Sequence, residues 1–352
     1  MKILEVKTGR QYQVVMDRGI IKDCGVYISK ISKAQKVMVV TDSNVAPIYY
    51  ETVRKSLEKN GFKVYKFVFE AGEQSKSLTT VQNIYNELAD NSFSRSDLIV
   101  ALGGGVTGDT AGFVAATYLR GIEFVQIPTS LLAQVDSSIG GKTGVDIKQG
   151  KNLIGAFWQP SLVLIDIDTL NTLPKMFFED GMGEVIKYGC IKSESLFKKL
   201  ENENILDIIE DVIYECVDIK RQVVENDEKE SGERMLLNFG HTFAHSLEKI
   251  YNYTTITHGQ AVAIGIILIS KATENNNITE KGTTKRIEKL LKKYNLPTRD
   301  INSLQNIVEN SFTDKKSSGD YINIVIVDKI GNSFTKKILK TELYNFCTLK
   351  GV

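Results

Sequence analysis

All three histidines of the 352-residue chain, His241, His245 and His258, fall within a window of 18 residues. Histidine is the commonest metal ligand and the side chain best suited to proton transfer near neutral pH. A single histidine is more often a satisfied core or surface residue than a catalytic one. The concentration of the whole supply in one window, rather than any one ring, therefore indicates an active site.

A polar stripe of helical period runs through the first two histidines. His241 and His245 are four residues apart, so on a helix they share a face. The remainder of a helix expected over 233–251 is apolar, so this stripe faces either solvent or a wet cavity, and we favour the cavity. Three further polar residues extend the stripe at steps of three and four, namely Arg234, Asn238 and Glu248.

Charge and composition exclude several classes of protein. Lys plus Arg total 44 against 43 for Asp plus Glu, so a net charge of +1 favours a small-molecule substrate over nucleic acid or an anionic membrane. The longest apolar stretch, 261–269, is shorter than the roughly 20 residues that span a bilayer, and the N-terminus lacks a signal-peptide core. We expect a cytoplasmic protein. No CxxC pair exists among the four cysteines, which argues against a thiolate metal site and a disulfide framework: Cys24, Cys190, Cys216 and Cys347.

Two patterns divide the chain near residue 170. Before it, β-rich runs alternate with amphipathic helices, which predicts an α/β domain with a Rossmann-like parallel sheet at residues 1–170. After it, long helices and one late β-like pair predict a mainly α-helical domain at residues 171–352, which holds the histidines. The expected strands are 36–42, 63–70, 97–105, 124–130 and 162–168, alternating with helices at 45–61, 77–91 and 106–119. The later helices are expected at 179–200, 204–226, 233–251, 258–275 and 281–295.

A glycine-rich loop at 103–108 satisfies the pattern GxGxxG directly after a strand and at the start of a helix. Glycines there let backbone N–H groups approach a pyrophosphate, and the helix N-terminus favours the anion. The loop follows about the third strand, so it is not simply the Rossmann fingerprint, and a tight strand-to-helix turn is the alternative. Asp42 and the loop at 70–76 supply groups that could hold a ribose. A second cluster, Ile139 to Thr143, is no Walker A site, because Asp136 occupies the leading glycine position.

Five motifs in order carry a family resemblance: GGGVTGDTAGF, VDSSIGGKTGVD, GMGEVIKYG, LLNFGHTFAHSLE and HGQAVAIG. Together they resemble the 3-dehydroquinate synthases, NAD-dependent carbon–oxygen lyases of the shikimate pathway to aromatic amino acids. The match runs from about residue 36 to the DKK at 314–316. It implies a homodimer, NAD on the α/β domain, and a divalent metal, usually zinc with cobalt as an alternative, held by the helical domain in the cleft between the two.

The resemblance implies that Glu184, His241 and His258 bind the metal. One carboxylate and two imidazoles leave coordination positions open, as a catalytic metal needs. His245 is then a proton-handling group one helical turn from the metal. Gln260 departs from the family, which commonly has glutamate there. If that glutamate holds the second nitrogen of a ligand histidine, glutamine would hold the ring more weakly and shift the metal affinity.

Substrate-facing residues implied by the resemblance are mostly cations, which suits a substrate with a phosphate and a carboxylate. Arg120 would reach the phosphate of the neighbouring subunit's substrate, so its role depends on the dimer. One of Lys315 and Lys316 would face the substrate, and the motif does not tell which. The others are Asp136, Lys142, Lys187, Lys220, Arg234 and Asn238. The residues implied to bind NAD are Asp42, Glu73, Lys76, Gly104, Gly105, Val106, Thr107, Gly108, Asp109, Thr129, Ser130, Asp136, Ser137, Lys142, Lys151, Asn152, Thr169, Leu170 and Thr172.

The implied reaction converts the seven-carbon acid phosphate DAHP into 3-dehydroquinate and phosphate. It consists of transient oxidation at C5, β-elimination of phosphate, reduction, ring opening and an intramolecular aldol step, so NAD is not consumed. A sister cyclase such as 2-deoxy-scyllo-inosose synthase would accept a substrate without the carboxylate. Arg234 and Asn238 fit the dehydroquinate type of enzyme better than this alternative. A metal-dependent polyol dehydrogenase would not need so many cations. A non-catalytic NAD-binding module would have little reason to keep Glu184 together with the three histidines.

Overall fold

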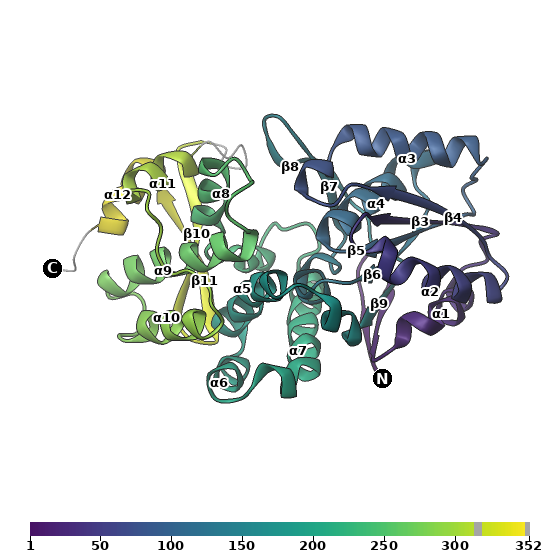
Figure 1. The fold of residues 1–352 in the computed structure, drawn as a ribbon. Coiled ribbons are helices and arrows are strands. Elements are labelled where there is room, and N and C mark those ends of the chain that lie inside the picture. Colours follow the sequence, from purple (N-terminus) through teal and green to yellow (C-terminus); the bar gives the residue numbers. More distant parts are fainter. Residues whose placement is uncertain (313–318, 349–352) are drawn as a thin grey trace. The chain divides into compact units, whose positions relative to one another are not determined.

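The computed structural model describes residues 1–312 and 319–348 (Figure 1). The chain forms two compact units. The first comprises residues 1–174 with 220–228, and the second comprises 175–219 with the described residues from 229 onward. The division after residue 174 lies near the predicted boundary, but the segment 220–228, expected in the second domain, belongs to the first unit. Among the described residues, no helix is long and apolar enough to cross a membrane.

A seven-stranded sheet in the order β1-β2-β9-β6-β5-β3-β4 organises the first unit. Strand β1 pairs antiparallel with β2, and the other neighbouring pairs are parallel. The predicted α/β fold with a parallel sheet is thereby confirmed, while β1 and β2 are strands that the pattern did not predict. The bounds are β1 (Lys2–Val6), β2 (Tyr12–Asp17), β3 (Lys36–Asp42), β4 (Lys63–Phe69), β5 (Leu98–Gly103), β6 (Glu123–Pro128) and β9 (Leu162–Asp166).

Helices cover both faces of this sheet, each over its own apolar core. Along β3, Val37 and Val39 pack into the core beneath α1 and α2, whereas Met38 and Val40 pack into the core beneath α3 and α4. Successive side chains of a strand point to opposite faces, so a strand buried on both sides reads as a continuous apolar run. Because these strands are parallel, their carboxyl ends lie at one edge of the sheet, where the loops that follow them meet. The helices are α1 (Cys24–Ile31), α2 (Ala46–Lys59), α3 (Leu78–Asp90) and α4 (Gly105–Thr117).

The antiparallel hairpin β7 (Lys142–Ile147) and β8 (Gly150–Phe157) was not predicted. It lies beside α4, where a Cβ on Gly112 would come within 2.5 Å of the Thr143 side chain. Gly140 and Gly141 have φ values of 91° and 67°, so the glycines of the rejected P-loop form the turn into β7. The hairpin carries several of the residues predicted to bind the cofactor.

The second unit is mainly helical, as predicted. Helix α9 begins and ends at the predicted residues, but the helix predicted at 179–200 is two helices. Ser193 separates them, and its side chain accepts a hydrogen bond from the Leu196 N–H at the start of α6. The elements are α5 (Lys175–Lys192), α6 (Glu194–Asn202), α7 (Ile205–Asn226), α8 (His241–Ile250), α9 (His258–Asn275), α10 (Thr283–Lys293), α11 (Leu304–Ser311), β10 (Tyr321–Lys329), β11 (Asn332–Leu339) and α12 (Lys340–Thr348).

The single helix predicted at 233–251 is wrong. The segment Glu233–Asn238 forms a 3₁₀ helix, and α8 begins only after Gly240, which has a φ of 81°. Glycine adopts this left-handed conformation at little cost. The stripe of Arg234 and Asn238 therefore does not continue the helical face that His241 and its neighbours share.

Candidate functional site

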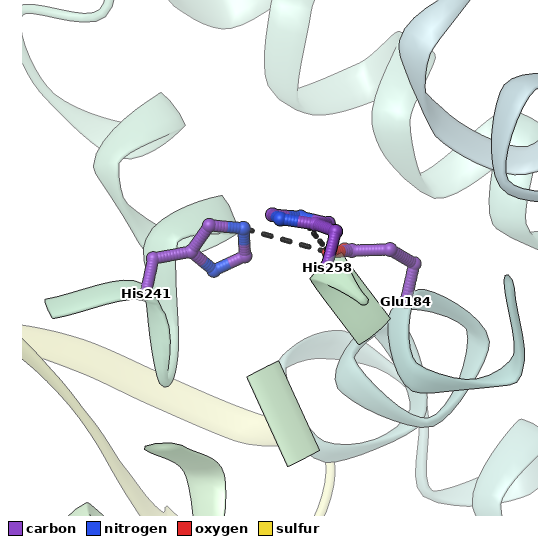
Figure 2. A group of neighbouring side chains, drawn as sticks. All are labelled: Glu184, His241 and His258. Atoms are coloured by element: carbon purple, nitrogen blue, oxygen red, sulfur yellow. Dashed lines mark hydrogen bonds and ion pairs between the residues drawn. The ribbon is translucent and has the colours of Figure 1, made fainter. Parts of the chain in front are cut away.

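Glu184, His241 and His258 meet in the second unit, each from a different helix (Figure 2). One potential ligand atom from each residue lies within 4.8 Å of the others. Glu184 Oε1 is 3.1 Å from His258 Nε2 and 3.5 Å from His241 Nε2. A buried carboxylate and two imidazoles that present the same ring nitrogen toward it form a donor set suited to zinc or a similar divalent ion.

Glycines let the three helices approach closely enough to form this cluster. A Cβ on Gly183 of α5 would lie 2.8 Å from the Gly259 carbonyl oxygen, and one on Gly259 of α9 would lie 1.9 Å from the Asp180 oxygen. A Cβ on Gly265 of α9 would lie 2.1 Å from the oxygen of Gly240, just before α8. Such contacts exclude any side chain. The glycines thus set the separations between the carboxylate on α5 and the imidazoles on α8 and α9.

The second nitrogen of each ring is also engaged. His241 Nδ1 lies 3.2 Å from the Phe239 carbonyl oxygen, and His258 Nδ1 lies 3.2 Å from Glu248 Oε1. A hydrogen bond at one imidazole nitrogen fixes the ring's orientation and tautomer and leaves the other nitrogen as a ligand. Both rings are therefore held with Nε2 toward Glu184.

Gln260 does not contact either ring nitrogen in this arrangement. Its Oε1 accepts a hydrogen bond from the Thr257 N–H at 3.2 Å, as part of the capping box that starts α9. The carboxylate that contacts the second nitrogen of His258 is Glu248, and not the residue at position 260 that the family resemblance suggested for this contact. Although glutamine stands at position 260 in place of the family's glutamate, the ring of His258 still has a carboxylate partner.

The electrostatics of the cluster suit a cation. Burial alone would raise the pKa of Glu184, but Lys187 and His241 hold it well below its usual range. Burial lowers the pKa of His241 to about 4, against the opposing effect of Glu184. Burial would also lower the pKa of His258, but Glu248 and Glu184 raise it well above its usual value. An ionised carboxylate and a neutral imidazole are ready for a metal, which would displace the proton from His258.

Two more predicted residues adjoin the cluster. The His245 ring packs edge-on against His241 with the centroids 5.5 Å apart, one helical turn further along α8. Lys187 forms an ion pair with Glu184, and both side chains are buried. Arg234, on the 3₁₀ helix, is the largest fully buried side chain among the described residues. Lys315 and Lys316 lie outside the described residues.

Glu230 is a residue that the sequence reasoning missed. Its Oε1 accepts a hydrogen bond from Asn238 Nδ2 at 2.8 Å, and its backbone has a φ of 62°. A left-handed conformation is uncommon for a residue other than glycine and occurs often at functional sites. In the sequence, Glu230 stands in the charged run DEKESGER and is indistinguishable from a solvated surface charge.

The glycine loop of the first unit follows β5 and opens α4 as predicted. Gly104 is the N-cap residue and provides no side chain to bond the N–H groups of the first helical turn. Ser130 Oγ and Ser137 Oγ lie 3.4 and 3.1 Å from the Cβ positions of Gly104 and Gly105, and Thr129 N–H donates to the loop at 3.0 Å. An uncapped helix N-terminus lined by small polar groups fits a diphosphate. The first turn of α4 contains the predicted residues Gly105, Val106, Thr107 and Gly108.

A polar network around the buried Lys76 joins three segments beside this loop. Lys76 Nζ lies 2.6 Å from both Asp109 Oδ2 and Asn152 Oδ1. Lys151 and Glu73 form an ion pair at 3.1 Å. Burial would lower the pKa of Lys76, but Asp109 and Glu73 raise it, so the lysine stays charged. The structure thus brings together these five residues predicted to bind the cofactor.

Other predicted residues of the first unit have local partners. Asp42 Oδ2 accepts from Thr107 Oγ1 at 3.3 Å, which places the carboxylate at the glycine loop. Its Oδ1 accepts from the N–H groups of Asn44 and Val45, just before α2. Lys220 forms an ion pair with Asp136. Lys142 and Arg120 are exposed. Thr169, Leu170 and Thr172 lie on the 3₁₀ helix Ile167–Thr172, where the two threonines bond to Gln134 and Tyr49.

Replacing Asp146 is expected to change how stability depends on pH. Burial raises the pKa of this carboxyl from 3.8 to about 6, against the Asn152 N–H that donates to it at 2.7 Å. A group with a raised native pKa contributes stability that is present below its unfolded pKa and lost as the pH rises through its native pKa. The free energy of unfolding of Asp146→Asn should therefore exceed that of the wild type by on the order of 1 kcal/mol at about pH 8, after a discount for solvent screening. Near pH 4 the two free energies should be equal. Urea unfolding at both pH values checks this, and a gap that widens toward acid would contradict it.

The fold and the cluster define a class of protein. The chain aligns with the solved structure of a 2-deoxy-scyllo-inosose synthase in complex with carbaglucose-6-phosphate, NAD⁺ and Co²⁺. The TM-score is 0.87 at 24% sequence identity, with 100% of both chains covered. The chain therefore shares its fold with this synthase over the full length of both chains.

Sequence relatives narrow the class to one family. The 3-dehydroquinate synthase N-terminal model matches residues 66–180, and the C-terminal model matches residues 181–317. The 3-dehydroquinate synthase of Clostridium acetobutylicum is 50% identical, with 98% of this chain and 99% of that protein covered. That of Clostridium perfringens strain SM101 is 52% identical, with 95% and 97% covered. The chain belongs to the 3-dehydroquinate synthase family.

Proposed function

We propose that the chain converts DAHP to 3-dehydroquinate and phosphate, in the shikimate pathway to aromatic amino acids, with NAD and a divalent metal. Zinc is the first choice of metal and cobalt the alternative. The observation that carries the proposal is the buried cluster of Glu184, His241 and His258, with His245 and Lys187 beside it. When bound, the metal would polarise the substrate hydroxyl, and NAD would accept a hydride and later return it.

The residues around the cluster have distinct roles in this proposal. His245 takes and returns the proton of the substrate hydroxyl, since its ring lies one turn from His241. Lys187 and Arg234 are buried cations. Buried cations of this kind form strong, charge-assisted hydrogen bonds to phosphate and carboxylate groups. They would hold the phosphate and the carboxylate of the substrate, and Asn238, oriented by Glu230, would bond to a hydroxyl.

The first unit would hold NAD. The uncapped N-terminus of α4 fits the diphosphate, and the network of Lys76, Asp109 and Asn152 supplies polar groups beside it. Lys220, paired with Asp136, would contact the substrate.

Further parts of the proposal are a homodimer, in which the exposed Arg120 reaches the partner's substrate, and a cytoplasmic location. None of the four cysteines, all of them among the described residues, forms a disulfide, in keeping with a reducing compartment.

A comparison of three substrates tests the proposed function. Purified protein with zinc and NAD is given DAHP, a hexose 6-phosphate without a carboxylate, or glycerol, and phosphate and NADH are followed together. We expect phosphate from DAHP without net NADH. Phosphate from the hexose phosphate alone would indicate the sister cyclase, sustained NADH from glycerol would indicate a polyol dehydrogenase, and no reaction with any of them would contradict an enzymatic role.

A further inference from the structure

Glu248 is a buried carboxylate of α8 that contacts the ring of His258 on α9. Its side chain is 3% exposed, and its Oε1 lies 3.2 Å from His258 Nδ1. On the other edge of the same ring, Nε2 lies 3.1 Å from Glu184 Oε1. Burial of a carboxylate is costly unless it is paired and hydrogen-bonded. Glu248 is neither a proposed metal ligand nor a proposed substrate contact. Its contact with the imidazole of His258 gives this buried carboxylate a polar partner.

The other polar groups at the start of α9 bond to the backbone rather than to the ring. Asp180 Oδ1 accepts from the Gly259 N–H at 2.5 Å, and Gln260 Oε1 accepts from the Thr257 N–H. Both contacts fix where α9 begins. Neither determines how the ring of His258 is turned about its side-chain bonds, which leaves Glu248 as the group that contacts Nδ1.

One face of α8 thus carries three functions. His241, His245 and Glu248 follow at steps of four and three, so they line the same side of the helix. The first is the proposed ligand from α8, the second the proposed proton-handling group, and the third holds the ligand from α9. The position of α8 therefore affects both imidazole ligands at once.

We propose that Glu248 is a positioning residue that accepts the Nδ1–H of His258 and so directs the Nε2 lone pair toward the point shared with Glu184 and His241. The inference rests on the metal site of the proposed function. A carboxylate behind a ligand histidine fixes its tautomer and raises its basicity, and removal of such a partner weakens metal binding by about 10- to 100-fold.

Zinc affinity measured by competition with a chromophoric chelator tests this role without substrate or turnover. We expect Glu248→Gln to bind zinc about 10-fold more weakly and Glu248→Ala about 100-fold more weakly, because the amide retains a poorer acceptor. Gln260→Ala is the matched control, since its side chain caps α9 without contacting the ring, and it should stay within about threefold of wild type. Wild-type affinity in both Glu248 variants, or an equal loss in Gln260→Ala, would overturn the proposal.

Histidine NMR separates positioning from a general loss of structure. With ¹⁵N-labelled histidine only three rings contribute signals. In the wild-type zinc form we expect His258 to carry its proton on Nδ1. In Glu248→Ala we expect His258 to lose this single tautomer, while the signals of His241 and His245 keep the chemical shifts of the folded protein. A wild-type His258 with its proton on Nε2 would overturn the assignment of Glu248. Failure of the wild-type protein to bind zinc at all would instead contradict the metal site of the proposed function.

Discussion

Replacement of His241 with alanine is expected to abolish tight metal binding, whereas replacement of His245 is expected to leave it intact. His241 presents Nε2 toward Glu184 at 3.5 Å, so its loss removes one of three ligands. The metal affinity should fall by more than the roughly 100-fold that loss of an outer partner causes. His245→Ala should retain one metal ion per chain and lose about 10²- to 10⁴-fold in kcat, the range for a general acid–base group.

Metal content after gel filtration, measured beside kcat and KM, distinguishes the two variants. Because both histidines lie on one face of α8, each substitution leaves a similar space beside the same helix, and each is the other's control. An equal loss of metal in the two variants would show that the ligand set is wrong. Full activity of His245→Ala would remove the proton-handling role from this residue.

The second large effect is expected from Gly259→Ala. Its methyl group would lie 1.9 Å from the Asp180 carbonyl oxygen, so α9 would have to move away from α5. Because Glu184 lies on α5 and His258 on α9, that movement separates two proposed ligands. We expect a loss of about 3 kcal/mol in the free energy of unfolding, as for severe overpacking, together with weaker zinc binding.

Urea unfolding and chelator competition on the same samples check the glycine prediction. Gly9→Ala is a suitable control, because a Cβ there would meet only the Glu228 carboxylate, no closer than 3.4 Å. Wild-type stability and zinc affinity in Gly259→Ala would contradict the view that close packing of α5 and α9 sets the geometry of the cluster.

Local pattern was sufficient for the buried strands and for the long helices. The run KVMVVTD predicts β3 with its observed bounds, because a strand covered on both faces is apolar throughout. Strand β1 was missed because it has only five residues at the edge of the sheet, and of these only Val6 is buried. A short edge strand of this kind gives little signal without its neighbour.

The parts of the site that the sequence did not predict depend on contacts between distant segments. Gly240, where the predicted helix is interrupted, packs against Gly265 of α9, and no local pattern reveals this contact. Glu248 was placed on the polar stripe, but only the packing of α8 against α9 shows that it meets His258. The family resemblance instead drew attention to position 260, because the family commonly has glutamate there and this chain has Gln260.

NAD is expected to be used and regenerated within each catalytic cycle, and an assay with NAD at less than one equivalent per enzyme tests this expectation most directly. The metal-free protein is supplied with zinc and excess DAHP, and released phosphate is counted against NAD and NADH. We expect many phosphates per NAD, no net NADH, and no phosphate before zinc is added. Phosphate release that stops at one equivalent per NAD, with an equal amount of NADH, would contradict it.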